Sequence, residues 1–276
     1  MSYITKSNLS LGPQFGSQMS QYAGMLALSK SLGSEIKFLQ EALTAFRGVK
    51  LFDAFNLDQI LVESDQRDYL TYTLEDVVCD EQVFKLNPNN NWDIQGWFHL
   101  YHYWKDYEDF VKDTFMFKQE ILDQATKQVE VIRNGEPYPI VSIHFRRGDY
   151  LQVASLNLTL DYYSEAISIF LEKFPYFKLL VFSDDIEWCK QVLEGDNIFF
   201  SEGNTNYVDM CMMTLCDHNI VANSSFSWWG AYLNRHTDKL VVCPEDYIGP
   251  SDRESQFINK NYYPKDWIAL KLNYTE

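Results

Sequence analysis

From residue 139 onward, short apolar runs alternate with longer segments in which apolar residues recur every three or four positions. The short runs are typical of buried strands and the longer segments of amphipathic helices. The predicted strands are residues 139–145, 177–182, 197–200, 219–222 and 239–243. The predicted helices are residues 160–174, 184–193, 207–216 and 225–235. This alternation indicates a parallel sheet with helices on both faces.

The chain before residue 139 is less regular. Residues 16–31 predict a glycine-rich turn that leads into a helix, and the aromatic-rich residues 96–117 are predicted to be helical over much of their length. A polar turn with Gly135 and Pro137 stands just ahead of the first clear strand, as is common at domain boundaries. We therefore predict an α/β protein with an N-terminal domain at residues 1–136 and a C-terminal domain at residues 137–276.

Composition and charge narrow the classes of function. The formal charge of −16 disfavours binding to nucleic acid, because phosphates require a basic face. The sequence has no run of about 18 apolar residues that would predict a transmembrane segment, and residues 1–12 do not resemble a signal peptide. The five cysteines form no C-x-x-C pattern and are typical of reduced thiols. We therefore expect a soluble cytoplasmic protein.

Two adjacent arginines, Arg146 and Arg147, follow directly after the predicted strand at residues 139–145. Ligands of open α/β sheets bind at the carboxyl ends of strands, and an arginine can hold phosphate oxygens through two parallel hydrogen bonds. Neighbouring side chains of an extended segment point to opposite sides. One arginine is therefore predicted to face a phosphate-bearing ligand and the other to brace the loop, on Asp149 or another carboxylate. The alternative is an ordinary surface ion-pair cluster.

Two further strand ends carry polar residues. Asp184 and Asp185 follow the strand at 177–182, where a carboxylate could bind a nucleotide base or ribose, or could cap the next helix. Residues 223–230 follow the strand at 219–222 and open a helix with small hydroxyl residues, which suits anion binding or an N-cap ahead of core tryptophans. The convergence of three such segments on one sheet edge favours a ligand site.

Other motifs predict little. The glycines of residues 12–19 would let the backbone approach a ligand, although the signal is weak by itself. His99 and His102 lie three residues apart without an evident third ligand, so we predict no metal site and no cofactor. The chain also contains neither a G-x-G-x-x-G motif nor a P-loop.

The chain resembles the bacterial α-1,2-fucosyltransferases of glycosyltransferase family 11. The resemblance rests on H-F-R-R-G-D-Y at residues 144–150, F-S-D-D at residues 182–185 and N-S-S-F-S-W-W-G-A at residues 223–231, which occur in the family's order. Two looser matches are G-S-Q-M-S-Q-Y-A at residues 16–23 and G-W-F-H-L at residues 96–100. The departures are Ser17 in place of the usual Asn and His99-Leu100 in place of a Gln-Ser pair. Both fall in the half expected to face the acceptor, so they leave the acceptor preference open.

The resemblance implies a GT-B-like enzyme with two Rossmann-like domains, which transfers fucose from GDP-L-fucose without a metal ion. By position, Arg146 would hold the diphosphate, with Arg147 as a required neighbour. The residues implied to be catalytic are Arg146, Arg147 and Asp149. The residues implied to bind the donor are Gly16, Gln18, His144, Arg146, Asp184, Asp185, Asn223, Ser224, Ser225 and Ser227. The acceptor side is represented by Ser17, Trp97 and His99.

The expected reaction inverts the anomeric centre and places fucose on the 2-hydroxyl of a terminal β-galactoside in an oligosaccharide or glycolipid precursor. Three carboxylates, Asp149, Asp161 and Glu165, remain open as the general base. One alternative is a GDP-sugar transferase of the same fold with another donor or acceptor. The other is a non-catalytic carbohydrate-binding protein, which would have no use for paired phosphate-binding arginines. The expected location is the cytoplasm, with the inner face of the membrane as a possible peripheral site.

Overall fold

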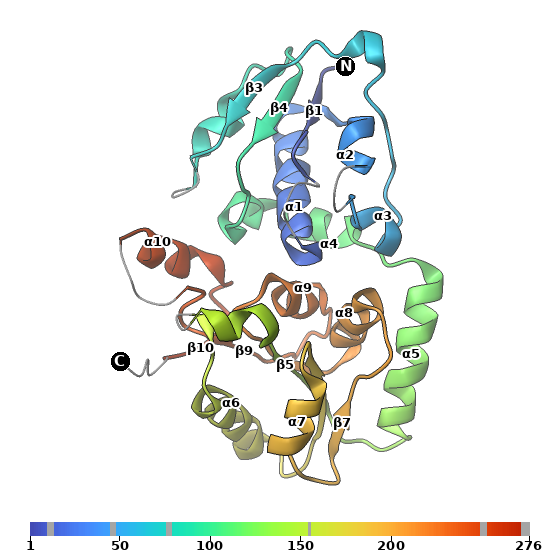
Figure 1. The fold of residues 1–276 in the computed structure, drawn as a ribbon, viewed down its shortest axis with the longest axis vertical. Coiled ribbons are helices and arrows are strands. Elements are labelled where there is room, and N and C mark those ends of the chain that lie inside the picture. Colours follow the sequence, from blue (N-terminus) through green and yellow to red (C-terminus); the bar gives the residue numbers. More distant parts are fainter. Residues whose placement is uncertain (10–13, 45–47, 76–78, 154–155, 249–252, 272–276) are drawn as a thin grey trace. The chain divides into compact units, whose positions relative to one another are not determined.

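The computed structural model describes residues 1–276 except 10–13, 45–47, 76–78, 154–155, 249–252 and 272–276. The chain forms two compact units, Met1–Phe117 and Lys118–Glu276, whose elements are labelled in Figure 1. The division falls earlier than the turn at 134–137 where we predicted the boundary. The reason is helix α5 (Gln119–Arg133), which buries Ile121, Ala125 and Val129 along one face and packs against α8 of the second unit.

The described residues of the second unit form a sheet of six parallel strands in the order β10-β9-β8-β5-β6-β7. The strands are β5 (Ile140–Phe145), β6 (Lys178–Ser183), β7 (Ile198–Phe200), β8 (His218–Ile220), β9 (Val241–Pro244) and β10 (Ile268–Leu270). Its other helices are α6 (Leu160–Lys173), α7 (Ile186–Val192), α8 (Asn206–Leu215), α9 (Ser225–Leu233) and α10 (Arg253–Tyr262). The predicted parallel sheet is confirmed, while α10 and β10 were not predicted.

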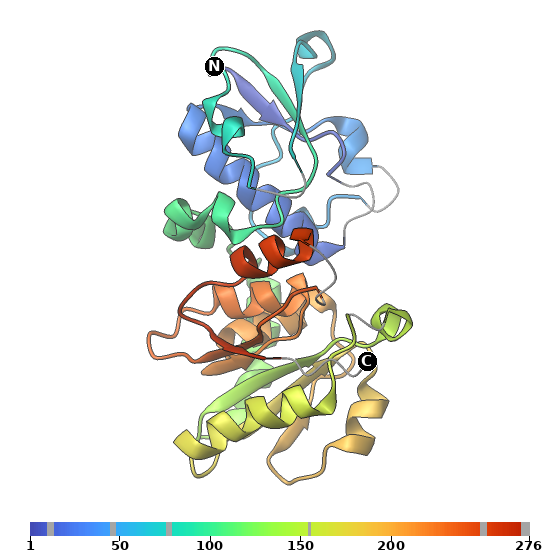
Figure 2. The same cartoon turned by 90° about the vertical axis from the view of Figure 1, so that its left-hand side faces the viewer.

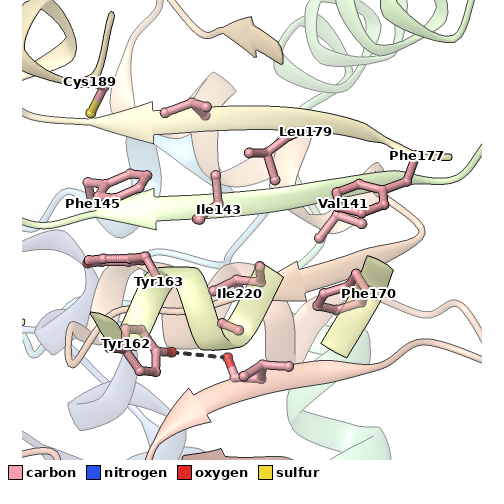
Figure 3. Packing of buried hydrophobic residues seen from close by; sticks show 13 residues of the cluster. Val141, Ile143, Phe145, Tyr162, Tyr163, Phe170, Phe177, Leu179, Cys189 and Ile220 are labelled. Carbon is pink, nitrogen blue, oxygen red and sulfur yellow. Dashed lines mark hydrogen bonds between the residues drawn. The ribbon is translucent and has the colours of Figure 1, made fainter. Parts of the chain in front are cut away.

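All residues of strand β5 are buried, because helices cover both faces of the sheet. Val141, Ile143 and Phe145 pack with α6 and α7 in the core cluster shown in Figure 3. The alternate residues Ser142 and His144 point the other way and bond residues of β8 and α9. In Figure 2, α6 (yellow) lies on one side of these strands and α9 (orange) on the other. Burial on both faces explains why four of the six residues of β5 are apolar, while the two polar ones are hydrogen-bonded within the fold.

In the first unit, the part of the chain that the structure describes forms a sheet of four parallel strands in the order β2-β1-β4-β3. The strands are β1 (Tyr3–Thr5), β2 (Glu35–Ile36), β3 (Leu70–Thr73) and β4 (Trp92–Gln95), and the helices are α1 (Phe15–Leu32), α2 (Gln40–Thr44), α3 (Leu51–Ala54) and α4 (Glu108–Thr114). Helix α1 begins at Phe15, so the expected turn at Gly16 is already helical. Within residues 96–117, predicted to be helical over much of their length, Tyr101–Tyr103 and Lys105–Tyr107 form short 3₁₀ turns and α4 follows them.

Helix α1 is buried on all sides rather than along one stripe. The close approach of Phe98 to α1 depends on Gly24, because a Cβ atom at that position would lie 2.2 Å from Cγ of Phe98. Glycine therefore sets how closely the segment after β4 packs on the central helix. Across the described part of the chain, no helix has the length and apolar character needed to cross a membrane.

Candidate functional site

Three predicted segments meet at the carboxyl edge of the second sheet. Strands β8, β5 and β6 are adjacent and parallel, with Ile143 opposite Ile220 on one side and Phe145 opposite Ser183 on the other. The residues that follow these strands therefore leave the sheet at the same edge. This arrangement gathers the arginine pair, the aspartate pair and the start of α9 in one place.

Arg146 is held by two carboxylates and lies near an aromatic ring. Its Nη1 donates to Oδ2 of Asp184 at 2.6 Å, and its Nη2 donates to Oδ1 of Asp149. The guanidinium carbon lies 5.2 Å from the ring centroid of Tyr150. The Arg146 side chain is only 18% exposed. Its orientation is therefore fixed, as electrostatic preorganisation at an anion-binding site requires.

The Arg147 side chain has different partners from that of Arg146. Its Nε donates to Oδ2 of Asp185 at 3.1 Å, and its guanidinium lies 3.5 Å from the ring centroid of Trp188. Its backbone N–H donates to Oδ1 of Asp184 at 2.9 Å. Asp184 thus bridges the two arginines. Arg147 braces the loop on Asp185, whereas Asp149, the partner we had named first, bonds Arg146 instead.

Asp184 and Asp185 both make contacts that stabilise the local fold. Asp185, not Asp184, is the N-cap of α7, where its side chain accepts a hydrogen bond from the N–H of Trp188 at 3.4 Å. Asp184 packs so closely on the loop that a Cβ atom at residue 148 would lie 2.7 Å from its Oδ2, so a side chain in place of Gly148 would displace this carboxylate. Both carboxylates are engaged by the arginine pair, and a contact of either with guanosine stays a prediction.

Three polar residues at the start of α9, Asn223, Ser224 and Ser227, are buried. Ser224 is the N-cap, and its hydroxyl accepts from the N–H of Phe226 at 3.3 Å. The Nδ2 of Asn223 donates to the main-chain oxygen of Leu156 at 2.9 Å, while its buried Oδ1 has no partner among the described residues. The Ser227 hydroxyl, predicted to contact the donor, instead points inward, because it bonds within the fold and the residue is 2% exposed.

His144 is buried beside this helix, with Nδ1 3.0 Å from Oγ of Ser227. Burial, and secondarily the charge of Arg146, lowers the pKa of His144 from 6.5 to about 3. The imidazole is therefore neutral at physiological pH. The unfolded chain takes up a proton below pH 6.5 that the folded chain does not, so stability is lost as the pH falls from 6.5 towards 3.

We expect His144→Gln to remove part of this acid sensitivity. Between pH 7 and pH 5, the wild type should lose about 2 kcal/mol through this group, at about 1.4 kcal/mol per pH unit below 6.5. The variant should show a correspondingly smaller loss in urea unfolding at the two pH values. His218, whose pKa is also lowered by burial, should leave some acid sensitivity in both proteins. An identical pH dependence of stability in the wild type and in His144→Gln would contradict the lowered pKa of His144.

The structure adds a fourth segment, after β9, which the sequence did not suggest. The side chain of Asn259 in α10 accepts from the N–H groups of Tyr247 and Ile248, each at 2.9 Å, and donates to Oδ1 of Asp246 at 2.9 Å. The Tyr150 hydroxyl, beside Arg146, donates to the main-chain oxygen of Asn223. The role of Asn259 is recognisable only once α10 is known to contact this loop through these three bonds.

The remaining predicted residues belong to the first unit. Gln18 is fully buried, where its side chain accepts from the N–H of Lys50 at 2.8 Å and donates to the oxygen of Gly48 at 3.0 Å. These bonds give Gln18 a structural role that the sequence did not reveal. Gly16 lies in the first turn of α1 and Ser17 follows it. Trp97 and His99 stack with ring centroids 5.2 Å apart and an interplanar angle of 7°.

The described residues contain no group of three or more His, Cys, Asp or Glu side chains that could hold a metal ion. This observation covers only that part of the chain. The independence of the reaction from metal ions therefore stays a prediction.

Comparison with known proteins shows the family to which this chain belongs. The chain matches the model described as Glycosyl transferase family 11 over residues 2–271. An α-1,2-colitosyltransferase of Escherichia coli is 28% identical in an alignment that covers 93% of this chain and 96% of that protein. Galactoside α-(1,2)-fucosyltransferase 1 of Bos taurus is 26% identical, over 80% of this chain and 64% of its own length.

Solved structures agree on the fold. POFUT1 in complex with GDP aligns with a TM-score of 0.59 at 13% identity, covering 87% of this chain and 98% of that chain. Fucosyltransferase NodZ from Bradyrhizobium aligns with a TM-score of 0.56 at 11% identity, covering 83% and 92%. These likenesses confirm the predicted GT-B-like fold. Because the family model spans nearly the whole chain, this protein belongs to glycosyltransferase family 11 and is a glycosyltransferase of the fucosyltransferase type.

Proposed function

We propose that this enzyme transfers L-fucose from GDP-L-fucose to the 2-hydroxyl of a terminal β-galactoside in a glycan. The observation that carries the proposal is Arg146, an oriented and partly buried cation beside the start of α9, at the carboxyl edge of a parallel sheet. Support for this donor and linkage comes from the relatives named α-(1,2)-fucosyltransferases. Support for the diphosphate comes from the arginine fork, which matches its geometry.

The proposed reaction is a single displacement. The acceptor oxygen bonds to C1 of fucose while the bond from C1 to the diphosphate oxygen breaks, so a β-linked donor gives an α-fucoside. GDP leaves with the bonding electron pair, and Arg146 offsets the charge that develops on it. For this to happen the diphosphate must take the place of a carboxylate on Arg146. Asp149 is the more exposed of its two partners, at 59% against 27% for Asp184.

The proton of the acceptor hydroxyl goes to a base or to solvent. Of the three carboxylates considered, Asp149 contacts Arg146, whereas Asp161 and Glu165 lie on the exposed face of α6. We therefore propose Asp149 as the base when it is released from Arg146. On the acceptor side, the half-exposed Trp97 and His99 stack offers a flat surface on which a pyranose ring could pack.

A second candidate donor is a colitose nucleotide, favoured by the E. coli relative named α-1,2-colitosyltransferase. Colitose lacks the 3-hydroxyl of fucose. A site built to bond that hydroxyl would reject colitose strongly, whereas a site without such a contact would discriminate weakly. The ratio of kcat/KM for the two donors therefore distinguishes a dedicated fucosyltransferase from a colitosyltransferase.

The proposed function is tested by the release of GDP from GDP-fucose, with and without lactose, in the presence of EDTA. We expect release that depends on lactose and persists in EDTA, with an α-1,2-linked product. Parallel reactions with GDP-mannose control for donor selectivity. Slow GDP release at the same rate with and without lactose would support GDP-fucose as the donor and refute the galactoside as the acceptor. The absence of release from a folded protein that binds GDP would refute the donor.

A further inference from the structure

The Ser227 hydroxyl lies at the centre of three contacts inside the second unit. Its Oγ is 3.1 Å from the backbone nitrogen of Ala222, 3.0 Å from Nδ1 of His144 and 3.4 Å from the main-chain oxygen of Ser224. The residue is 2% exposed, so water cannot replace any of these partners. The hydroxyl therefore has to satisfy its hydrogen bonds within the fold.

A hydroxyl carries one proton and can also accept hydrogen bonds. The N–H of Ala222 can only donate, so Oγ of Ser227 accepts from it. The hydroxyl proton then has two possible acceptors, the oxygen of Ser224 and Nδ1 of His144. The Ser224 oxygen already accepts the helical N–H of Trp228 at 3.0 Å and lies farther from Oγ. The shorter contact, to His144, is therefore the better acceptor.

A proton donated to Nδ1 fixes the tautomer of the ring. A neutral imidazole has one protonated and one unprotonated nitrogen, so His144 must carry its own proton on Nε2. Nε2 has no hydrogen-bond partner among the described residues. It is also not one of the fully buried polar atoms that lack a partner. His144 is otherwise packed tightly, with the ring of Phe226 5.5 Å away. Its Nε2–H is thus left without a hydrogen bond inside the described part of the fold.

We propose that Ser227 is a positioning residue that fixes His144 in the Nε2–H tautomer, so that His144 presents a constant hydrogen-bond donor to an acceptor atom of the donor nucleotide. The inference rests on the proposed function for the identity of that nucleotide. In this proposal Ser227 affects ligand binding by orienting His144 and does not contact the ligand itself. A second partner such as Ser227 commonly decides which ring nitrogen of a histidine is protonated.

The tautomer is tested directly, without ligand, by nitrogen NMR of the full chain with labelled histidine. The signals of His144 are assigned by their loss in His144→Gln. We expect a protonated Nε2 and an unprotonated Nδ1 in the wild type, and a mixture of tautomers in Ser227→Ala. Protonated Nδ1 in the wild type would overturn the proposal, as would an unchanged tautomer in Ser227→Ala. The wild-type spectrum decides the question even where Ser227→Ala fails to fold.

The use of Nε2–H is tested by GDP titration calorimetry of two matched variants. The amide nitrogen of Gln can occupy the place of Nε2, whereas that of Asn reaches only the place of Nδ1. We expect His144→Gln to bind GDP roughly 5- to 10-fold more tightly than His144→Asn. Equal or reversed affinities would refute the role of His144. If the wild type itself bound no GDP, the proposed function would fail instead, while the NMR result would still stand.

Discussion

Replacing Arg146 by alanine is expected to lower the turnover of GDP-fucose roughly 100- to 1,000-fold, the usual cost of removing one donor that stabilises a developing negative charge. The change removes the guanidinium and also leaves Asp184 and Asp149 facing the diphosphate without their shared cation. Like charges then oppose both donor binding and departure of GDP. Single-turnover GDP release, measured at saturating GDP-fucose and lactose, separates the chemical step from binding.

Two further variants serve as controls for Arg146→Ala. Arg146→Lys keeps the charge but loses the planar fork, and we expect it to recover only part of the lost turnover. Arg133→Ala removes another partly buried, ion-paired arginine, whose Nη2 lies 3.1 Å from Asp217 near the amino end of β5. That variant should lose stability but retain turnover in the folded fraction. Near-normal turnover of Arg146→Ala would refute the proposed role of Arg146 in the reaction.

The second unit was predictable because its strands and helices produce distinct patterns. Strand β5 is buried on both faces and is mostly apolar, with Ile140, Val141, Ile143 and Phe145 among its six residues. Helix α6 instead buries Tyr162, Ala166 and Phe170 at helical spacing. Helix α10 and strand β10 produce weaker patterns, because α10 is mostly polar and β10 is an edge strand of three residues. The first unit was hard to predict because α1 is buried all round and shows no amphipathic stripe.

The candidate site was predictable in its position but not in its bonds. The order of strands along the sequence is enough to bring Arg146 and Asp184 to one edge. The assignment of Asp185 rather than Asp184 to the helix cap depends on a single residue of register, which sequence patterns do not resolve. Likewise, Gln18 and Ser227 lie in segments with functional motifs, yet their side chains bond the fold itself. Only the three-dimensional contacts distinguish these roles.

The largest effect on stability is expected from Gly24→Ala in helix α1. Alanine gains up to about 1 kcal/mol of helix propensity over glycine. The added Cβ, however, would lie 2.2 and 2.4 Å from Cγ and Cδ1 of Phe98. Phe98 cannot withdraw easily, since it is fully buried and packs edge-on against Tyr103 at 4.9 Å. Overpacking of this kind costs about 1–3 kcal/mol or more, so we expect a net destabilisation of the first unit.

Urea unfolding followed by tryptophan fluorescence measures this loss, with Ser31→Ala at an exposed position of α1 as a control that should change little. Truncating the ring relieves the clash, so Gly24→Ala combined with Phe98→Leu should be less destabilising than the sum of the two single changes. Because Phe98 lies between Trp97 and His99, Gly24→Ala should also raise the KM for lactose more than that for GDP-fucose. A variant as stable as the wild type would show that α1 and Phe98 are not in close contact.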